Sequence, residues 1–166
     1  MSFVETLLPE FDQEMATTRR VLERVPSDKG EWKPHPKSFA LGHLAQLVAR
    51  MPGWQVSAVT EQTLDLASAP RYSMQPTEEL LEVFDENVRA ARAALAATND
   101  AALAESWSLT MGAQTLFTTT RANVVRQNIN HLVHHRGQLT VYLRLLDVPV
   151  PSIYGPTADE PWGAKS

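Results

Sequence analysis

Apolar residues recur at helical intervals in four stretches of the chain. In the first stretch they stand three, four or seven positions apart, so that they share one face of a helix. These residues are Val4, Leu8, Phe11, Met15, Leu22 and Val25. Pro26 marks the end of this helix, because proline cannot continue helical hydrogen bonding.

The second stretch predicts a helix that begins at Phe39 after a Ser38 cap. The pair Pro52 and Gly53 is expected to kink or break this helix, with helix resuming over residues 54–62.

The third helix is expected to follow a Thr77 cap, and the fourth and longest is predicted over residues 121–146. The third helix carries its apolar face on Leu80, Phe84, Val88, Ala91 and Leu95.

Residues 105–120 follow a different pattern, because apolar and polar residues alternate before Gly112 and β-branched residues follow it. This pattern predicts a short irregular hairpin before the last helix. The tail from Val148 is rich in proline and is expected to wrap as an extended segment. The fold class predicted from these patterns is all-α, an antiparallel four-helix bundle with one short irregular hairpin, in a single domain over residues 1–166.

Composition and charge narrow the range of functions. The chain has 166 residues, of which 43% are hydrophobic, enough for a core of its own. Its net charge of −4 argues against nucleic acid as a partner and, weakly, against an anionic membrane surface. Cysteine is absent, so any thiol in a reaction would have to be a cosubstrate. The acidic N-terminus does not resemble a signal peptide, and a cytoplasmic location is expected.

Histidine is concentrated in the last predicted helix, in the stretch "NINHLVHHRGQL" over residues 128–139. His131 and His135 stand one turn apart on one face, where two imidazoles can converge on one metal ion. His134 points elsewhere. A third ligand would have to come from a facing helix, and His43, on the edge of the second helix's apolar face, is the best candidate.

Metal binding is one of several explanations of this pattern. A histidine pair at this spacing also occurs on surfaces or in hydrogen-bonded core networks, and His43 alone suits a hydrogen-bonded core position. Asn128, Gln138 and Tyr142 share the stripe of the histidine pair and are candidates to orient water or substrate.

For the charged residues near this stripe and in the tail, a structural role is favoured over a functional one. Arg136 is expected to form a salt bridge to another helix rather than to bind an acidic substrate group. Asp159 and Glu160 lie in the tail and are expected to be solvated loop charges.

Two stretches resemble the DinB/YfiT-like family. The stretch "NHLVHHRGQLTVYLRLLDVPVPSIYGPTADE" resembles the end of these proteins, and "WKPHPKSFALGHLAQLVARMPGW" resembles their second-helix region. The resemblance implies a four-helix bundle, commonly dimeric, with a divalent ion held by three histidines. His131 and His135 match the pair from the last helix. Many members carry histidine at the position of Leu47, and we assign the third ligand to His43, one turn earlier, because leucine cannot coordinate.

The resemblance also implies a metal-dependent enzyme that acts on a small molecule, with zinc or nickel as the expected ion. Members with a known activity include thiol-dependent transferases and isomerases. We therefore expect a thiol-dependent transferase that uses a low-molecular-weight thiol, or a hydrolase, and we expect a homodimer. Two alternatives stay open: a non-catalytic module that binds a metal or ligand, and a structural bundle.

Overall fold

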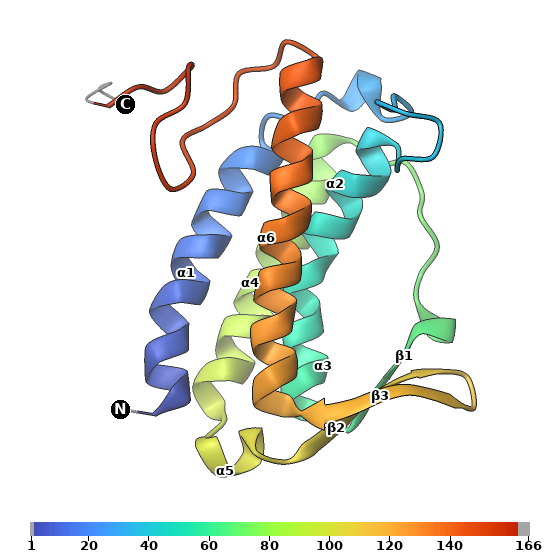
Figure 1. The fold of residues 1–166 in the computed structure, drawn as a ribbon, viewed down its shortest axis with the longest axis vertical. Coiled ribbons are helices and arrows are strands. Elements are labelled where there is room, and N and C mark those ends of the chain that lie inside the picture. The colour runs from blue at the N-terminus through green and yellow to red at the C-terminus, as the bar shows by residue number, and fades with distance from the viewer. Residues whose placement is uncertain (1, 163–166) are drawn as a thin grey trace.

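The computed structural model describes residues 2–162, in which long helices stand side by side and the strands lie at one end of them (Figure 1). The helices are α1 (Phe3–Leu22), α2 (Leu41–Arg50), α3 (Trp54–Thr60), α4 (Thr77–Ala97), α5 (Asp100–Leu103) and α6 (Arg121–Leu145). Short 3-10 turns lie at Ser27–Lys29, Met51–Gly53 and Leu66–Ser68. The strands are β1 (Thr63–Asp65), β2 (Ser106–Met111) and β3 (Gln114–Thr120).

The strands form one mixed three-stranded sheet, so the all-α prediction is wrong. β2 and β3 make the hairpin expected over residues 105–120, with an irregular step between Leu109 and Thr110. β1 lies parallel to β2, with Thr63 opposite Ser108. Sequence periodicity missed β1 because a strand of three residues has no detectable pattern and its partner lies far along the chain.

The helices also do not alternate in direction, as a simple antiparallel bundle requires. In Figure 1, α1 and α6 run one way, whereas α2, α3 and α4 run the other way. The segment 61–76 therefore returns along the bundle before α4 begins. Two hydrogen bonds agree with these directions. The Thr77 hydroxyl at the start of α4 donates to the carbonyl of Val25, just after the end of α1. The Phe3 N–H at the start of α1 donates to the Asp100 carboxylate, just after the end of α4, so α1 and α4 run in opposite directions. Bundles with a long crossover connection have this kind of topology.

The break predicted within the second helical stretch is confirmed. α2 ends at Arg50, and Pro52 lies in a 3-10 turn before α3 begins. The two expected helix caps are wrong. The N-cap of α2 is Ala40, and Thr77 is the first residue of α4, with its hydroxyl bonded to the carbonyl of Val25 just after the end of α1.

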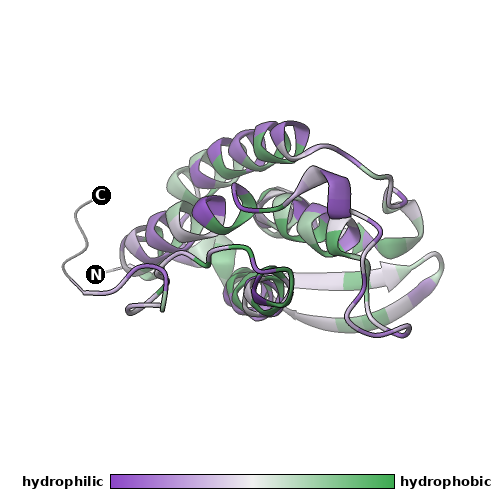
Figure 2. Ribbon diagram, turned by 90° about the horizontal axis from the view of Figure 1, so that it is seen from above, coloured by the Kyte–Doolittle hydropathy of each residue, from purple (hydrophilic) through white to green (hydrophobic). Residues whose placement is uncertain are grey.

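The core is shared by the long helices. α1 packs against α4 and α6, and the pair α2–α3 packs against the same two helices. Viewed from above, the strands extend to one side of the helices, and the helices carry both hydrophilic and hydrophobic positions (Figure 2). Side chains that are fully buried come from every long helix and include Phe11, Leu44, Phe84 and Leu139. Within residues 2–162, no helix combines the length and apolar character that crossing a membrane requires.

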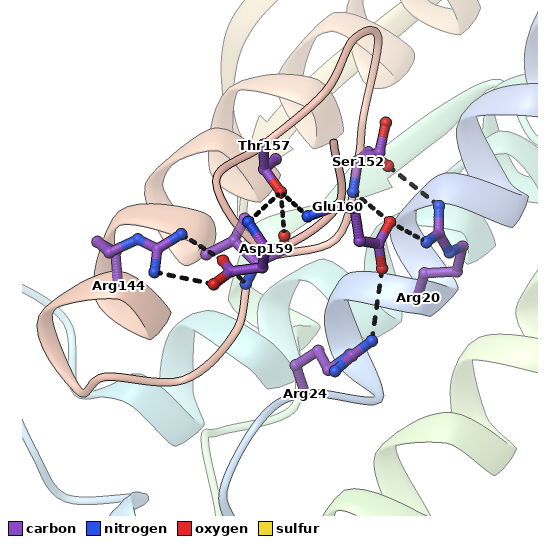
Figure 3. Close-up of polar contacts among 8 residues, drawn as sticks. Arg20, Arg24, Arg144, Ser152, Thr157, Asp159 and Glu160 are labelled. Carbon is purple, nitrogen blue, oxygen red and sulfur yellow. Dashed lines mark hydrogen bonds and ion pairs between the residues drawn. The ribbon is translucent and has the colours of Figure 1, made fainter. Parts of the chain in front are cut away.

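The described part of the tail is fastened to two helices by its acidic residues (Figure 3). Asp159 pairs with Arg144 of α6, and Glu160 pairs with Arg20 of α1 at 2.5 Å. Glu160 also accepts a hydrogen bond from the backbone N–H of Ser152, and these partners hold the pKa of its carboxyl below its ordinary value. The expectation that both acids are merely solvated is wrong, because the tail folds back over α1 and α6.

Candidate functional site

His131 and His135 face each other on α6 and form the centre of the candidate site. Their Nε2 atoms lie 2.9 Å apart, and their ring centroids are 4.7 Å apart. The Nδ1–H of His135 donates to the Gln138 side-chain oxygen at 2.8 Å. In a neutral His135 the Nε2 atom is then an acceptor, so the Nε2–H of His131 donates to it.

The two imidazoles differ in their surroundings. His135 is buried, with 8% of its surface exposed, whereas His131 is more open and its ring lies 5.7 Å from that of Trp54. Partial burial lowers the pKa of His131, and the neighbouring His135 and His134 lower it further. His131 is therefore neutral near pH 7, the protonation state in which imidazole can accept a proton or a metal ion.

His43, the third predicted ligand, belongs to a different cluster. Its ring stacks on Tyr72 at 4.7 Å and contacts Phe39 at 4.5 Å between centroids. Burial lowers the pKa of His43, and nearby Lys33 adds to the effect. Among residues 2–162, no three His, Asp or Glu side chains come together as a set of metal ligands. The fold thus brings together two of the three predicted ligands, while aromatic packing fixes the ring of His43.

The three candidates for orienting water or substrate occupy different places. Gln138 contacts the histidine pair through His135. Asn128 lies on the wall of a cavity beside the pair. The hydroxyl of Tyr142 donates to the carbonyl of Phe39 at 3.2 Å, which connects α6 to the segment before α2.

A cavity of about 390 Å³ borders the His131 side of the pair. It lies between α3, α6, β1 and the β2–β3 hairpin, and its volume falls in the range of small-molecule sites. Its apolar walls are Trp54, Leu64, Leu66, Ala69, Trp107, Leu109, Phe117 and Val124. Asp65, Ser68, Gln127, Asn128 and His131 supply polar groups.

This cavity could not be predicted from the sequence. Its walls come from α3, the strands and α6, and only the tertiary structure brings these elements together. The alternation of Trp107 and Leu109 was the available signal, because residues two apart on a strand share a face.

A smaller pocket of about 230 Å³ lies on the His135 side of the pair. Lys37, Ser38, Phe39, Gln138 and Tyr142 line it together with His135. The histidine pair therefore stands between two hollows, one largely apolar and one with more polar character.

Arg136, the next residue on α6, faces away from this site. Its guanidinium pairs with Glu14 of α1 at 2.6 Å and also donates to the Thr18 hydroxyl at 3.2 Å and the Tyr154 hydroxyl at 2.7 Å. Only 2% of its surface is exposed. The predicted salt bridge from Arg136 to another helix is confirmed.

The fold and site define a protein class: a mostly helical bundle with a small sheet at one end and a histidine pair beside an apolar cavity. The chain belongs to the DinB family, whose model matches residues 1–164. The resemblance found in the sequence is thus confirmed.

Solved structures share this fold. A DinB-like protein from Bacillus subtilis has 16% identity and a TM-score of 0.71, over 89% of this chain and 97% of that one. A DinB-like protein from Bacillus cereus has 20% identity and a TM-score of 0.72, over 90% and 97%. A mycothiol-dependent maleylpyruvate isomerase has 14% identity and a TM-score of 0.57, over 84% and 63%. A comparison with proteins of curated function gives no match.

Proposed function

We propose that the protein is an enzyme that acts on a small, largely apolar molecule in the cavity beside His131, with the pair His131 and His135 as its reacting groups. The observation that carries this proposal is the 2.9 Å approach of the two Nε2 atoms next to a largely apolar cavity. An apolar pocket with a few polar groups and a titratable residue of shifted pKa is a common form of active site.

The pair is suited to proton transfer. Gln138 holds His135 in the tautomer that accepts the Nε2–H of His131. This arrangement leaves the Nδ1 lone pair of His131 available, and the lowered pKa keeps that nitrogen unprotonated near neutral pH. His131 can then take a proton from a bound molecule and return it, which is general acid–base catalysis.

The three-histidine metal site stays a prediction. The donors that come together are two imidazoles, and His43 packs against Phe39 and Tyr72 instead, so a three-histidine set does not fit this arrangement. Gln138 does hold His135 as the outer partner of a ligating histidine would.

A thiol-dependent transfer reaction is the finer form of the proposal. It is supported by the fold shared with the mycothiol-dependent maleylpyruvate isomerase. The smaller pocket at His135 offers a second molecule a place on the far side of the pair. Because the chain has no cysteine, the thiol would be a cosubstrate of low molecular weight. A hydrolase is the alternative enzyme. The other alternative is a module that binds a small molecule without catalysis. It is favoured by the finding that no third metal ligand joins the histidine pair among the described residues.

The enzyme proposal is tested by measuring the consumption of small thiols with uncharged electrophiles, and the hydrolysis of uncharged esters. His131→Ala should lower kcat/KM roughly 100-fold, because the proton acceptor is removed. His35→Ala is the matched control, since His35 is an exposed loop histidine outside the pair, and it should leave the rate unchanged. If the natural chain turns over none of these substrates, the binding-module alternative replaces the enzyme.

Metal content is tested by elemental analysis of protein purified without a histidine tag. Zinc or nickel near one ion per chain, lost in His131→Ala, would support the metal-dependent form of the proposal. Metal-free natural protein that turns over substrate would refute that form and leave the acid–base proposal.

The homodimer also stays a proposal. Val141 and Leu145 stand one turn apart on α6 and are each 57% exposed, which gives this helix an apolar outer stripe. Light scattering should give twice the mass of the chain. A monomer at high concentration would contradict the dimer.

A further inference from the structure

The smaller pocket, on the His135 side of the histidine pair, carries hydrogen-bond donors that the protein itself does not use. Lys37 lines this pocket, and among residues 2–162 its ammonium forms no ion pair. The Ser38 hydroxyl and the side-chain NH2 of Gln138 belong to the same wall, and neither donates to an acceptor within the described part of the chain. The Gln138 oxygen is already occupied by the Nδ1–H of His135. These donor groups, one of them a cation, are therefore free to bond to water or to a ligand.

The wall of this pocket has no negative charge to balance the cation. None of its described lining residues is Asp or Glu. The Tyr142 hydroxyl, a further polar group of the wall, donates to the carbonyl of Phe39 at 3.2 Å and is thus engaged within the fold. A second cation lies near the same loop, because burial and the ammonium of Lys33 lower the pKa of His43, whose ring contacts that of Phe39. The potential in the pocket is therefore positive, which favours a bound anion.

The larger cavity on the other side of the pair has the reverse charge. Asp65 lines it, and hydrogen bonds from the backbone N–H groups of Ala67 and Gly112 lower the pKa of the Asp65 carboxyl. No lysine or arginine is among its described lining residues. A negatively charged group is therefore favoured on the Lys37 side of the histidine pair and disfavoured on the Asp65 side.

We propose that the smaller pocket binds an oxyanion, a carboxylate or phosphate group, through the Lys37 ammonium, the Ser38 hydroxyl and the Gln138 side-chain NH2. An oxyanion accepts several hydrogen bonds at once, and those from charged donors are the stronger ones. The side chain of Phe39, which is 44% exposed, lies in the same wall and gives the carbon skeleton of the ligand an apolar contact. The inference rests on the proposed function, because it names the chemical class of the second molecule beside the histidine pair.

The test compares benzoate with benzamide, which have nearly the same shape but differ in charge. Phenyl phosphate is the third probe, and its affinity relative to benzoate shows which oxyanion the pocket prefers. The NMR signals of the Ser38 backbone N–H and the Gln138 side-chain NH2 report binding at low ionic strength, where charge interactions are least screened. Benzoate should shift these signals saturably, and benzamide should bind roughly five- to tenfold more weakly. If neither anion binds more tightly than benzamide, the inference is overturned.

Lys37→Met tests the cation of the pocket. The variant should weaken benzoate about five- to tenfold and leave benzamide unchanged, because methionine keeps the apolar stem of lysine but not its charge. Lys29→Met is the matched control, since Lys29 pairs with Asp28 and lies outside the pocket wall. The control removes the same charge from the chain and should change neither probe. Equal weakening of benzoate by the two variants would refute the role of Lys37 and overturn the proposed site.

Ser38→Asp reverses the test by placing a carboxylate in the pocket wall. The new negative charge lies next to Lys37 in the chain and should weaken benzoate more than roughly tenfold, whereas benzamide should be affected little. Benzoate that binds this variant as tightly as the natural protein would contradict the inference. The Tm of each variant checks that the fold is kept.

These measurements need no turnover, so they separate the inference from the proposed function. An inactive protein that prefers benzoate to benzamide would refute the enzyme and keep the oxyanion pocket. An active protein without this preference would keep the enzyme and refute the oxyanion pocket.

Discussion

His135 and Arg136 are adjacent residues of α6 that face two sides of the molecule with opposite properties. Arg136 faces α1 and the tail, where it forms an ion pair with Glu14 at 2.6 Å and donates hydrogen bonds to two hydroxyl groups. His135 faces the candidate site, where it forms hydrogen bonds with His131 and Gln138 and where a largely apolar cavity borders His131. The Arg136 side has the polar pairing expected of a structural network. The histidine side keeps polar groups available, as a binding site requires.

The largest expected effect is on the Arg136 side. Arg136→Ala should lower the free energy of unfolding by about 3–5 kcal/mol, because it leaves the Glu14 carboxylate buried without its partner. Urea denaturation measures the change. Arg126→Ala is the matched control, since Arg126 pairs with Glu10 between the same two helices but both side chains are about 40% exposed. The control should cost less than about 1 kcal/mol, and equal losses in the two variants would remove the contrast between the sides.

The histidine side should respond to pH. The pKa of His131 is lowered on folding, so the unfolded chain binds its proton more tightly than the folded chain does. The contribution of this group is favourable above the ordinary histidine pKa of about 6.5 and is lost as the pH falls through the folded value. Denaturation of chelator-treated protein at several pH values should show a fall in stability below pH 6.5.

The origin of this fall can be assigned by substitution. His131→Gln should reduce the loss of stability at acid pH, and the remainder should come partly from His43, whose pKa is lowered by burial and by Lys33. The same acid-induced loss in His131→Gln and in the natural protein would assign the effect to other groups.

The smallest expected effect is at the tail, which covers the Arg136 side. Glu160→Gln should cost less than about 1 kcal/mol of global stability, because its partner Arg20 is largely exposed. Hydrogen exchange at the backbone N–H of Ser152 should nevertheless become faster, since that N–H donates to the Glu160 carboxylate. Unchanged exchange at Ser152 would show that other contacts hold the tail.

Local patterns were sufficient for features that depend on neighbours in the chain. The apolar spacing predicted the long helices, and the pair Pro52 and Gly53 predicted the break between α2 and α3. The alternation before Gly112 predicted the hairpin. The four-residue spacing of His131 and His135 was enough to place their rings together, because one helical turn separates them.

Contacts between segments that lie far apart in the chain could not be predicted from these patterns. The parallel pairing of β1 with β2 depends on a strand too short to show periodicity. The direction of α4 depends on the path of segment 61–76, which periodicity does not report. The expected meeting of His43 with the other histidines was based on helix register, whereas the ring of His43 is placed by Phe39 and Tyr72.

The sequence by itself determined the family, the helical segments and the histidine pair, because each depends on residues close together in the chain. The tertiary structure decided which side chains from distant segments share a space. It separated His43 from the pair, and it assembled Trp54, Trp107 and His131 around one cavity. The physical reason is that helix and strand periodicity fix the direction of a side chain about its own axis, whereas packing between elements fixes what that side chain meets.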